Sequence, residues 1–171
     1  MRLSGLIGAV ATAAALAWSF WSMATDAPAL YVLVLTIGTF GAGIFYGKPT
    51  QALVDHPWRN RRRLRGLAQA CGTRQLARLL TRIGWNRAGR RPIRGRSDLG
   101  PFREDAAGAL LSHGISLVFH LVASAGLAAV GQAFWGVAAL VLGFVLHAWS
   151  ALLQIDVLGR VDGVQARITR A

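Results

Sequence analysis

Long apolar runs separated by short polar breaks occupy both ends of the chain. Four such runs contain no Asp, Glu, Lys or Arg: residues 3–24, 29–47, 106–130 and 133–155. A helix needs about 20 apolar residues to cross the hydrocarbon core of a bilayer. The pattern therefore predicts one all-α membrane domain over residues 1–171, with four spans in two helical hairpins that turn at 25–28 and 131–132.

The first run has one competing interpretation. Arg2 precedes it, and Ser22-Met23-Ala24 resembles the cleavage site of a signal peptide. The apolar stretch is nevertheless longer than the core of most signal peptides. We expect a retained span and keep the signal peptide as the alternative.

Positive charge is concentrated in the middle of the chain. The net charge is +12, and fifteen of the nineteen Lys and Arg residues lie between Lys48 and Arg103. The two turns carry neither residue, so the positive-inside rule places both termini and residues 48–105 in the cytoplasm, which makes this a multi-pass protein of the cell (inner) membrane. We expect the anionic inner leaflet as the counter-charge, and no nucleic acid, because no nucleic-acid-binding motif is present.

An amphipathic helix is predicted over residues 73–85 of this basic segment. One face carries Leu76, Leu79, Leu80 and Ile83, and the opposite face carries Arg74, Arg78 and Arg82. Such a helix should lie in the interface of the inner leaflet, with Trp58 and Trp85 as depth anchors. Residues 88–100 read as loop, and the residues from Asp156 onward as a polar tail.

Small residues and the one cysteine add little chemistry. Gly43 and Gly47 form a G-x-x-x-G pair that favours a helix–helix partner. Cys71 alone excludes a disulfide framework and a cysteine-based zinc site. We expect it to be an apolar residue of an amphipathic helix, with palmitoylation or a catalytic thiol as alternatives.

Ionisable side chains within spans are costly and mark candidate sites. His113 and His120 lie in the third run, and His147 lies in the fourth. In antiparallel helices joined at 131–132, His113 and His147 fall at nearly one depth, with Asp105 and Gln154 level at the cytoplasmic rim. These side chains could lock the bundle, form a catalytic site, or bind a bis-histidine haem or a metal.

The stretch from Gly84 to Gly114 resembles the glycosyl-4,4′-diaponeurosporenoate acyltransferase family, small multi-span enzymes that esterify a carotenoid glycoside. The family pattern is roughly G-F-x-K followed by Y-L-x-x-F-x-x-E-T-x-R-A-E-x-x-H-W. The matching positions are Gly84, Trp85, Arg87, Leu99, Phe102, Asp105 (at the Glu), Ala109 and His113. A second block puts His147, Gln154 and Arg160 at the Asn, Gln and last Arg of the final span. Gly108 and Leu110 depart from the pattern.

The resemblance implies a membrane-embedded acyltransferase for a lipid-like or isoprenoid acceptor. His113 would be the general base, with Asp105, His147 and Gln154 beside it. A basic set would attract the phosphates of an acyl-CoA co-substrate, or else anionic lipid: Arg74, Arg78, Arg82, Arg87 and Arg160. No other cofactor and no metal ligand is expected. The alternatives are a non-catalytic subunit or assembly factor of a larger complex, and a bis-histidine haem protein through His113 and His147.

Overall fold

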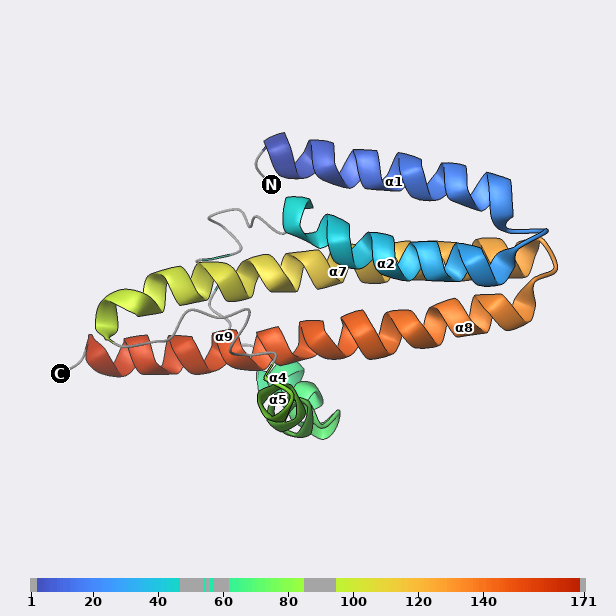
Figure 1. Cartoon of the computed structure of the whole chain (residues 1–171). Coiled ribbons are helices and arrows are strands. Elements are labelled where there is room, and N and C mark those ends of the chain that lie inside the picture. Colours follow the sequence, from blue (N-terminus) through green and yellow to red (C-terminus); the bar gives the residue numbers. More distant parts are fainter. Residues whose placement is uncertain (1–2, 47–53, 55, 57–61, 85–94, 170–171) are drawn as a thin grey trace. The chain divides into compact units, whose positions relative to one another are not determined.

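Helices provide all the regular secondary structure of the residues described. The computed structural model describes residues 3–46, 54, 56, 62–84 and 95–169 (Figure 1). In chain order the elements are α1 (Leu3–Met23), α2 (Pro28–Tyr46), α4 (Arg62–Ala70), α5 (Thr73–Arg82), the 3₁₀ turn η2 (Arg96–Asp98), α7 (Leu99–Ala129), α8 (Ala133–Gly143), the π-helix η3 (Phe144–Ala148) and α9 (Trp149–Ile168). The expected all-α class is confirmed for this part of the chain.

Three helical stretches are long and apolar enough to cross a membrane. They extend over Gly5–Met23, Arg96–Ala129 and Ala133–Ile168, and a shorter apolar helix covers Pro28–Gly41. Their exposed side chains are often large and apolar, as for Trp18 and Trp21 of α1, which are 73% and 88% exposed. Apolar surface of this extent indicates a membrane protein. Three of the four expected spans are thus matched by long apolar helices.

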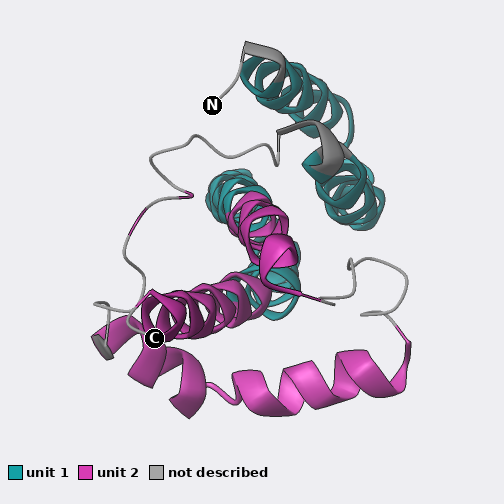
Figure 2. Ribbon diagram, turned by 90° about the vertical axis from the view of Figure 1, so that its left-hand side faces the viewer, with its two compact units in different colours: residues 1–48, 111–148 teal, residues 49–110, 149–171 magenta. Residues whose placement is uncertain are grey.

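The helices group into two compact units, which Figure 2 colours separately. The first unit contains residues 1–48 and 111–148, and the second contains residues 49–110 and 149–171. The chain passes between them three times: between residues 48 and 49, within α7, and where η3 meets α9. Each unit has its own core and is described by itself.

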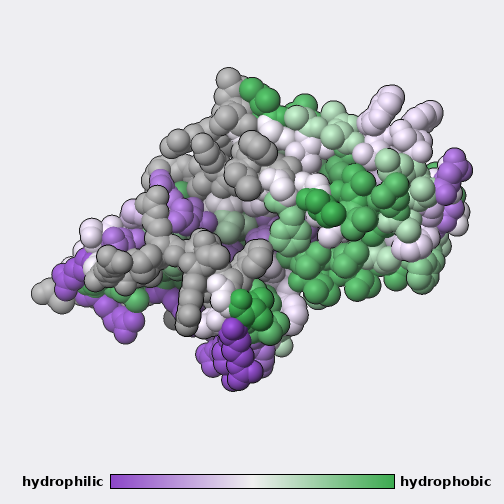
Figure 3. Space-filling model, in the orientation of Figure 1, coloured by the Kyte–Doolittle hydropathy of each residue, from purple (hydrophilic) through white to green (hydrophobic). Residues whose placement is uncertain are grey.

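The first unit is built from the apolar hairpins. Helices α1 and α2 pack side by side, and α2 also packs against α8 (Figure 1). Its core contains Leu35 of α2 and Leu127 of α7, both fully buried. Gln132 donates an amide hydrogen bond to the carbonyl oxygen of Thr25 at 3.1 Å, which joins the two turns at one end of the unit. In Figure 3, apolar residues dominate the visible surface over α2 and α8.

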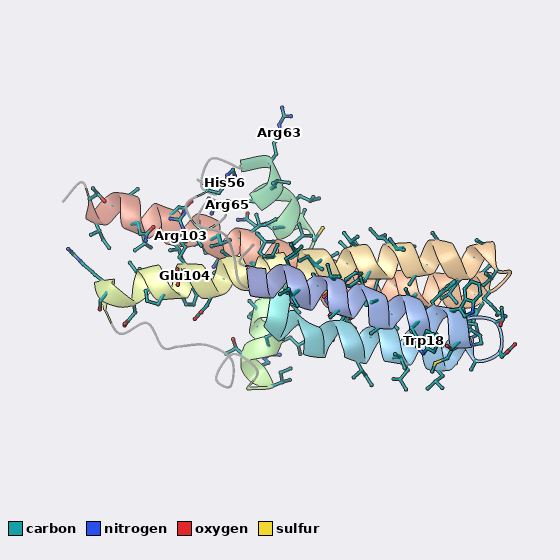
Figure 4. All side chains as sticks on the ribbon, turned by 90° about the horizontal axis from the view of Figure 1, so that it is seen from above. Trp18, His56, Arg63, Arg65, Arg103 and Glu104 are labelled. Atoms are coloured by element: carbon teal, nitrogen blue, oxygen red, sulfur yellow. The ribbon has the colours of Figure 1, made fainter. Side chains whose placement is uncertain are left out.

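The second unit is held by charged side chains of α9. Both α4 and α5 pack against this helix. Asp156 is buried and accepts from Arg160, while Arg65 of α4 lies 3.9 Å away. Asp162 pairs with Arg103 at 3.0 Å. Figure 4 shows Arg63, by contrast, pointing away from the helices.

The predicted start of α7 and the predicted end of α9 are wrong. The loop expected at residues 88–100 ends sooner, because α7 begins at Leu99 rather than at residue 106. Pro101 falls in the first turn, where its missing N–H has no intrahelical partner to lose. The expected polar tail is helix through Ile168, because the carboxylates of Asp156 and Asp162 find arginine partners.

The basic segment contains more helix than expected. α4 was not expected, and Cys71 lies in the turn between α4 and α5 rather than on a helix. Gly72 has φ +75°, a conformation in which glycine is favoured, and this residue separates the two helices. α5 ends at Arg82, before a turn at Ile83 and Gly84, instead of continuing to residue 85. Trp58 and Trp85 lie outside the described residues.

Candidate functional site

Three histidines meet in the first unit. His113 and His120 come from α7, where they are seven residues and about two helical turns apart, and His147 comes from η3. Their ring centroids lie 5.6 Å (His113 to His147) and 4.9 Å (His120 to His147) apart. His113 and His147 were expected at one depth, and the structure goes further by bringing their rings into contact. His120 joins them as well, and both His120 and His147 are almost completely buried.

The contacts among Thr39, His147 and His113 favour one arrangement of the protons on two of the rings. The Thr39 hydroxyl donates to the Leu35 carbonyl oxygen at 2.8 Å, so in this arrangement its oxygen accepts a hydrogen bond from His147 Nε2 at 3.4 Å. A neutral His147 protonated on Nε2 has a bare Nδ1. That atom lies 3.3 Å from His113 Nδ1, which must then be the donor. His113 is left with a lone pair on Nε2.

His120 is held differently. Its Nδ1 lies 3.0 Å from the Ser116 carbonyl oxygen and donates to it. Its buried Nε2 has no hydrogen-bond partner among the described residues. Gly143 lies so close that an added Cβ would overlap the His120 side chain. The glycine therefore makes room for this ring beside His147.

The backbone around His147 is unusual. Residues Phe144–Ala148 form a π-helix within an otherwise α-helical stretch. Such segments are rare and frequently occur at functional sites. Here the π segment carries the one histidine that contacts both of the others.

The predicted catalytic set is divided between the two units. His113 and His147 belong to the first unit, whereas Asp105 and Gln154 belong to the second. Asp105 is exposed and Gln154 is buried. The proton chain that the structure places at His113 uses Thr39 and His147, and Thr39 was not among the predicted residues.

The arginines that were predicted to bind phosphate groups do not all lie at one place. Arg74, Arg78 and Arg160 line one cavity of the second unit. Arg82 is exposed in the last turn of α5, and Arg87 lies outside the described residues. Of the predicted G-x-x-x-G pair, Gly43 packs so closely on Ser112 of α7 that a Cβ would overlap its hydroxyl, and Gly47 lies outside the described residues.

Sequence reasoning missed the polar partners that organise both units. Thr39 and Ser116 resemble the other hydroxyl residues of the spans, most of which bond only to a carbonyl four residues earlier, as Thr12 and Ser19 do. Nothing in the spacing distinguishes them. The pair between Arg103 and Asp162 could have been found only by treating the tail as a helix.

The geometry does not suit a haem between His113 and His147. Their Nδ1 atoms are 3.3 Å apart and face each other, so in this arrangement no porphyrin plane lies between the two rings. Within the described ranges, no three histidine, cysteine or carboxylate side chains are grouped so that they could hold a metal ion.

Comparisons with protein-family models, with curated proteins and with solved structures found no match.

Proposed function

We propose that this protein is a membrane-embedded acyltransferase that esterifies a hydroxyl group of a lipid-like or isoprenoid acceptor. The observation that carries the proposal is the row of contacts from Thr39 through His147 to His113 Nδ1, an arrangement that leaves Nε2 of His113 with its lone pair. A neutral imidazole with a free nitrogen is the group that acyl transfer to an alcohol requires as its base. The resemblance around Asp105 and His113 favours the same chemistry.

The proposed reaction moves one proton and exchanges one bond. His113 Nε2 takes the proton of the acceptor hydroxyl as the oxygen attacks the carbonyl carbon of an acyl thioester. The bond between that carbon and sulfur then breaks, and the thiolate recovers the proton from His113. His147 accepts from His113 Nδ1 throughout, so it would orient the base and stabilise the transient imidazolium.

The surroundings of His113 suit an acceptor dissolved in the membrane. His113 is only partly buried, whereas its partner His147 is buried. The first unit presents exposed apolar side chains, such as Val118 and Leu121 on the same helix. A lipid-like acceptor could therefore approach from the apolar surface. His147 and Thr39, which form the relay behind the base, are buried away from water.

We also propose that α2 completes a four-span arrangement with both termini in the cytoplasm. The hydrogen bond from Gln132 to Thr25 supports it, because it joins the two turns that lack Lys and Arg at one end of the first unit. Turns without basic residues are favoured on the outer side.

The test is direct detection of product. Purified protein in nanodiscs is given isotopically labelled acyl-CoA with a glycosylated isoprenoid, a free isoprenoid alcohol or a diacylglycerol, and esters are measured by mass spectrometry. We expect labelled ester that depends on the protein. If the folded protein yields none with any of these acceptors, a non-catalytic membrane subunit becomes the better description.

A further inference from the structure

Three arginine side chains line one cavity of the second unit. The cavity has a volume of about 480 Å³ and is lined by Arg74, Ala77 and Arg78 of α5 and by Arg160 of α9. Arg74 and Arg78 are four residues apart, so they share one face of α5. Because α5 packs on α9, that face and Arg160 border the same space.

The charge of this cavity is not balanced by the protein around it. Asp156 is already shared by Arg160, Arg65 and the Gln69 amide. In the part of the chain that the structure describes, neither Arg74 nor Arg78 forms an ion pair, and both are exposed. Like charges gathered in one cavity repel each other, and an anion bound there would relieve the repulsion.

Arginine geometry selects the kind of anion. The planar fork of a guanidinium matches the paired oxygens of a phosphate, and such bonds are among the stronger ones that proteins make. The volume lies in the range of small-molecule sites, about 300–1,000 Å³. Three of the four lining side chains end in a guanidinium group, so an anionic group at this cavity would have arginines on two helices beside it.

The apolar side of α5 indicates where the phosphate comes from. Leu79 and Ile83 are 52% and 63% exposed. At 3.6 residues per turn they project roughly 140° and 180° around the helix from Arg74. If this apolar side dips into the bilayer, the cavity faces away from it toward water. That arrangement favours a phosphate on a water-soluble molecule over a lipid headgroup.

We infer that this cavity binds the phosphate groups of a water-soluble phosphoester, and that in the proposed reaction this ligand is the acyl-CoA donor. The identity of the donor rests on the proposed function. The phosphate site itself rests on the convergence of Arg74, Arg78 and Arg160.

The experiment measures binding without turnover. The full chain in phosphatidylcholine nanodiscs is titrated calorimetrically with inorganic pyrophosphate and, separately, with coenzyme A. The double variant Arg74→Gln/Arg78→Gln removes two lining groups that are exposed, and Arg82→Gln removes an exposed arginine of the same helix that does not line the cavity. We expect the double variant to bind both probes at least about tenfold more weakly, since hydrogen bonds to charged groups are strong. We expect Arg82→Gln to bind as the parent does.

Three outcomes would overturn the inference. The parent could fail to bind either probe, the double variant could bind both as the parent does, or Arg82→Gln could weaken binding as much as the double variant, which would mean diffuse charge. Adding phosphatidylglycerol to the nanodiscs distinguishes the sources. If it displaces pyrophosphate from the parent, the phosphate site stands but belongs to a lipid headgroup, and the water-soluble source is wrong.

The inference and the proposed function can fail separately. A protein that binds pyrophosphate through these arginines yet forms no ester keeps the phosphate site and loses the acyltransferase activity. A protein that forms ester while the double variant binds pyrophosphate as the parent does keeps the activity and loses the site.

Discussion

The first unit buries neutral polar side chains, and the second buries charged ones. In the first unit, Thr39 contacts His147 and bonds to the Leu35 carbonyl oxygen, and His120 bonds to the Ser116 carbonyl oxygen. In the second unit, Asp156 and Asp162 are buried against arginines. Removing one partner of a buried ion pair destabilises a protein strongly, because the other charge stays buried without compensation. A neutral hydrogen bond contributes little net stability. The contrast suggests that ion pairs stabilise the second unit. The buried polar groups of the first unit contribute less to stability, which favours a catalytic role for them.

The largest expected effect is on activity, through His113. His113→Ala should lower ester formation by about 10²–10⁴-fold, the usual loss when a general base is removed. Folding should change little, because His113 is only partly buried. The measurement is labelled ester per unit of membrane-inserted protein. His120→Ala is the comparison and should cost less, because His120 Nε2 takes no part in the relay. Near-normal product from His113→Ala would make the histidine cluster structural.

The next effect is on stability, through Asp162. Its side chain is 5% exposed, and that of its partner Arg103 is 14% exposed. Asp162→Ala leaves the Arg103 charge without this partner and should lower the free energy of unfolding by about 3–5 kcal/mol. Unfolding of the purified protein in mixed detergent measures it. Glu104→Ala, at an exposed acidic residue, is the control, and equal stability of the two variants would contradict a role for charge in this unit.

A smaller effect on the rate of ester formation is expected from Thr39, the last member of the relay. Thr39→Val removes the acceptor of His147 Nε2 and should slow ester formation by about two- to tenfold, the equivalent of one neutral hydrogen bond. Thr39→Ser keeps the hydroxyl and should restore the rate. If Thr39 had only a structural role, Thr39→Val would lower stability together with kcat. A lower kcat at unchanged stability, restored by Thr39→Ser, would therefore indicate a role in the relay. A Thr39→Ser variant as slow as Thr39→Val would remove Thr39 from the relay.

The last prediction concerns topology and carries no energetic effect. Cys71, in the turn between α4 and α5, should be cytoplasmic. A thiol reagent that cannot cross membranes should label it only after cells are permeabilised. Labelling in intact cells would reverse the proposed orientation.

Hydropathy predicted most of the helices because a chain in lipid must satisfy its backbone within each span. It failed where local signals suggested irregular structure. Gly100 and Pro101 look like a helix break, yet they occupy the first turn of α7. The carboxylates after residue 155 look like a tail, yet two of their arginine neighbours, Arg65 and Arg103, come from distant positions in the sequence.

The candidate site was predictable in part for a similar reason. Hairpin geometry alone brings His113 and His147 to one depth, so their proximity follows from counting residues. The partnership with Thr39 depends on how α2 packs within the first unit, which neither periodicity nor composition reveals. The cavity at Arg74 and Arg160 likewise depends on the packing of α5 on α9.

The π-helix at Phe144–Ala148 has a consequence for how this chain tolerates changes in length. A π segment is equivalent to an α-helix with one inserted residue. Deleting one residue between Gly143 and His147 could restore regular α-helix, but it would turn the His147 ring by roughly 100° about the helix axis, away from His113. Many substitutions of the exposed Phe144 or Val145 would leave the ring in place. At this point of the chain, the number of residues matters more than their identity.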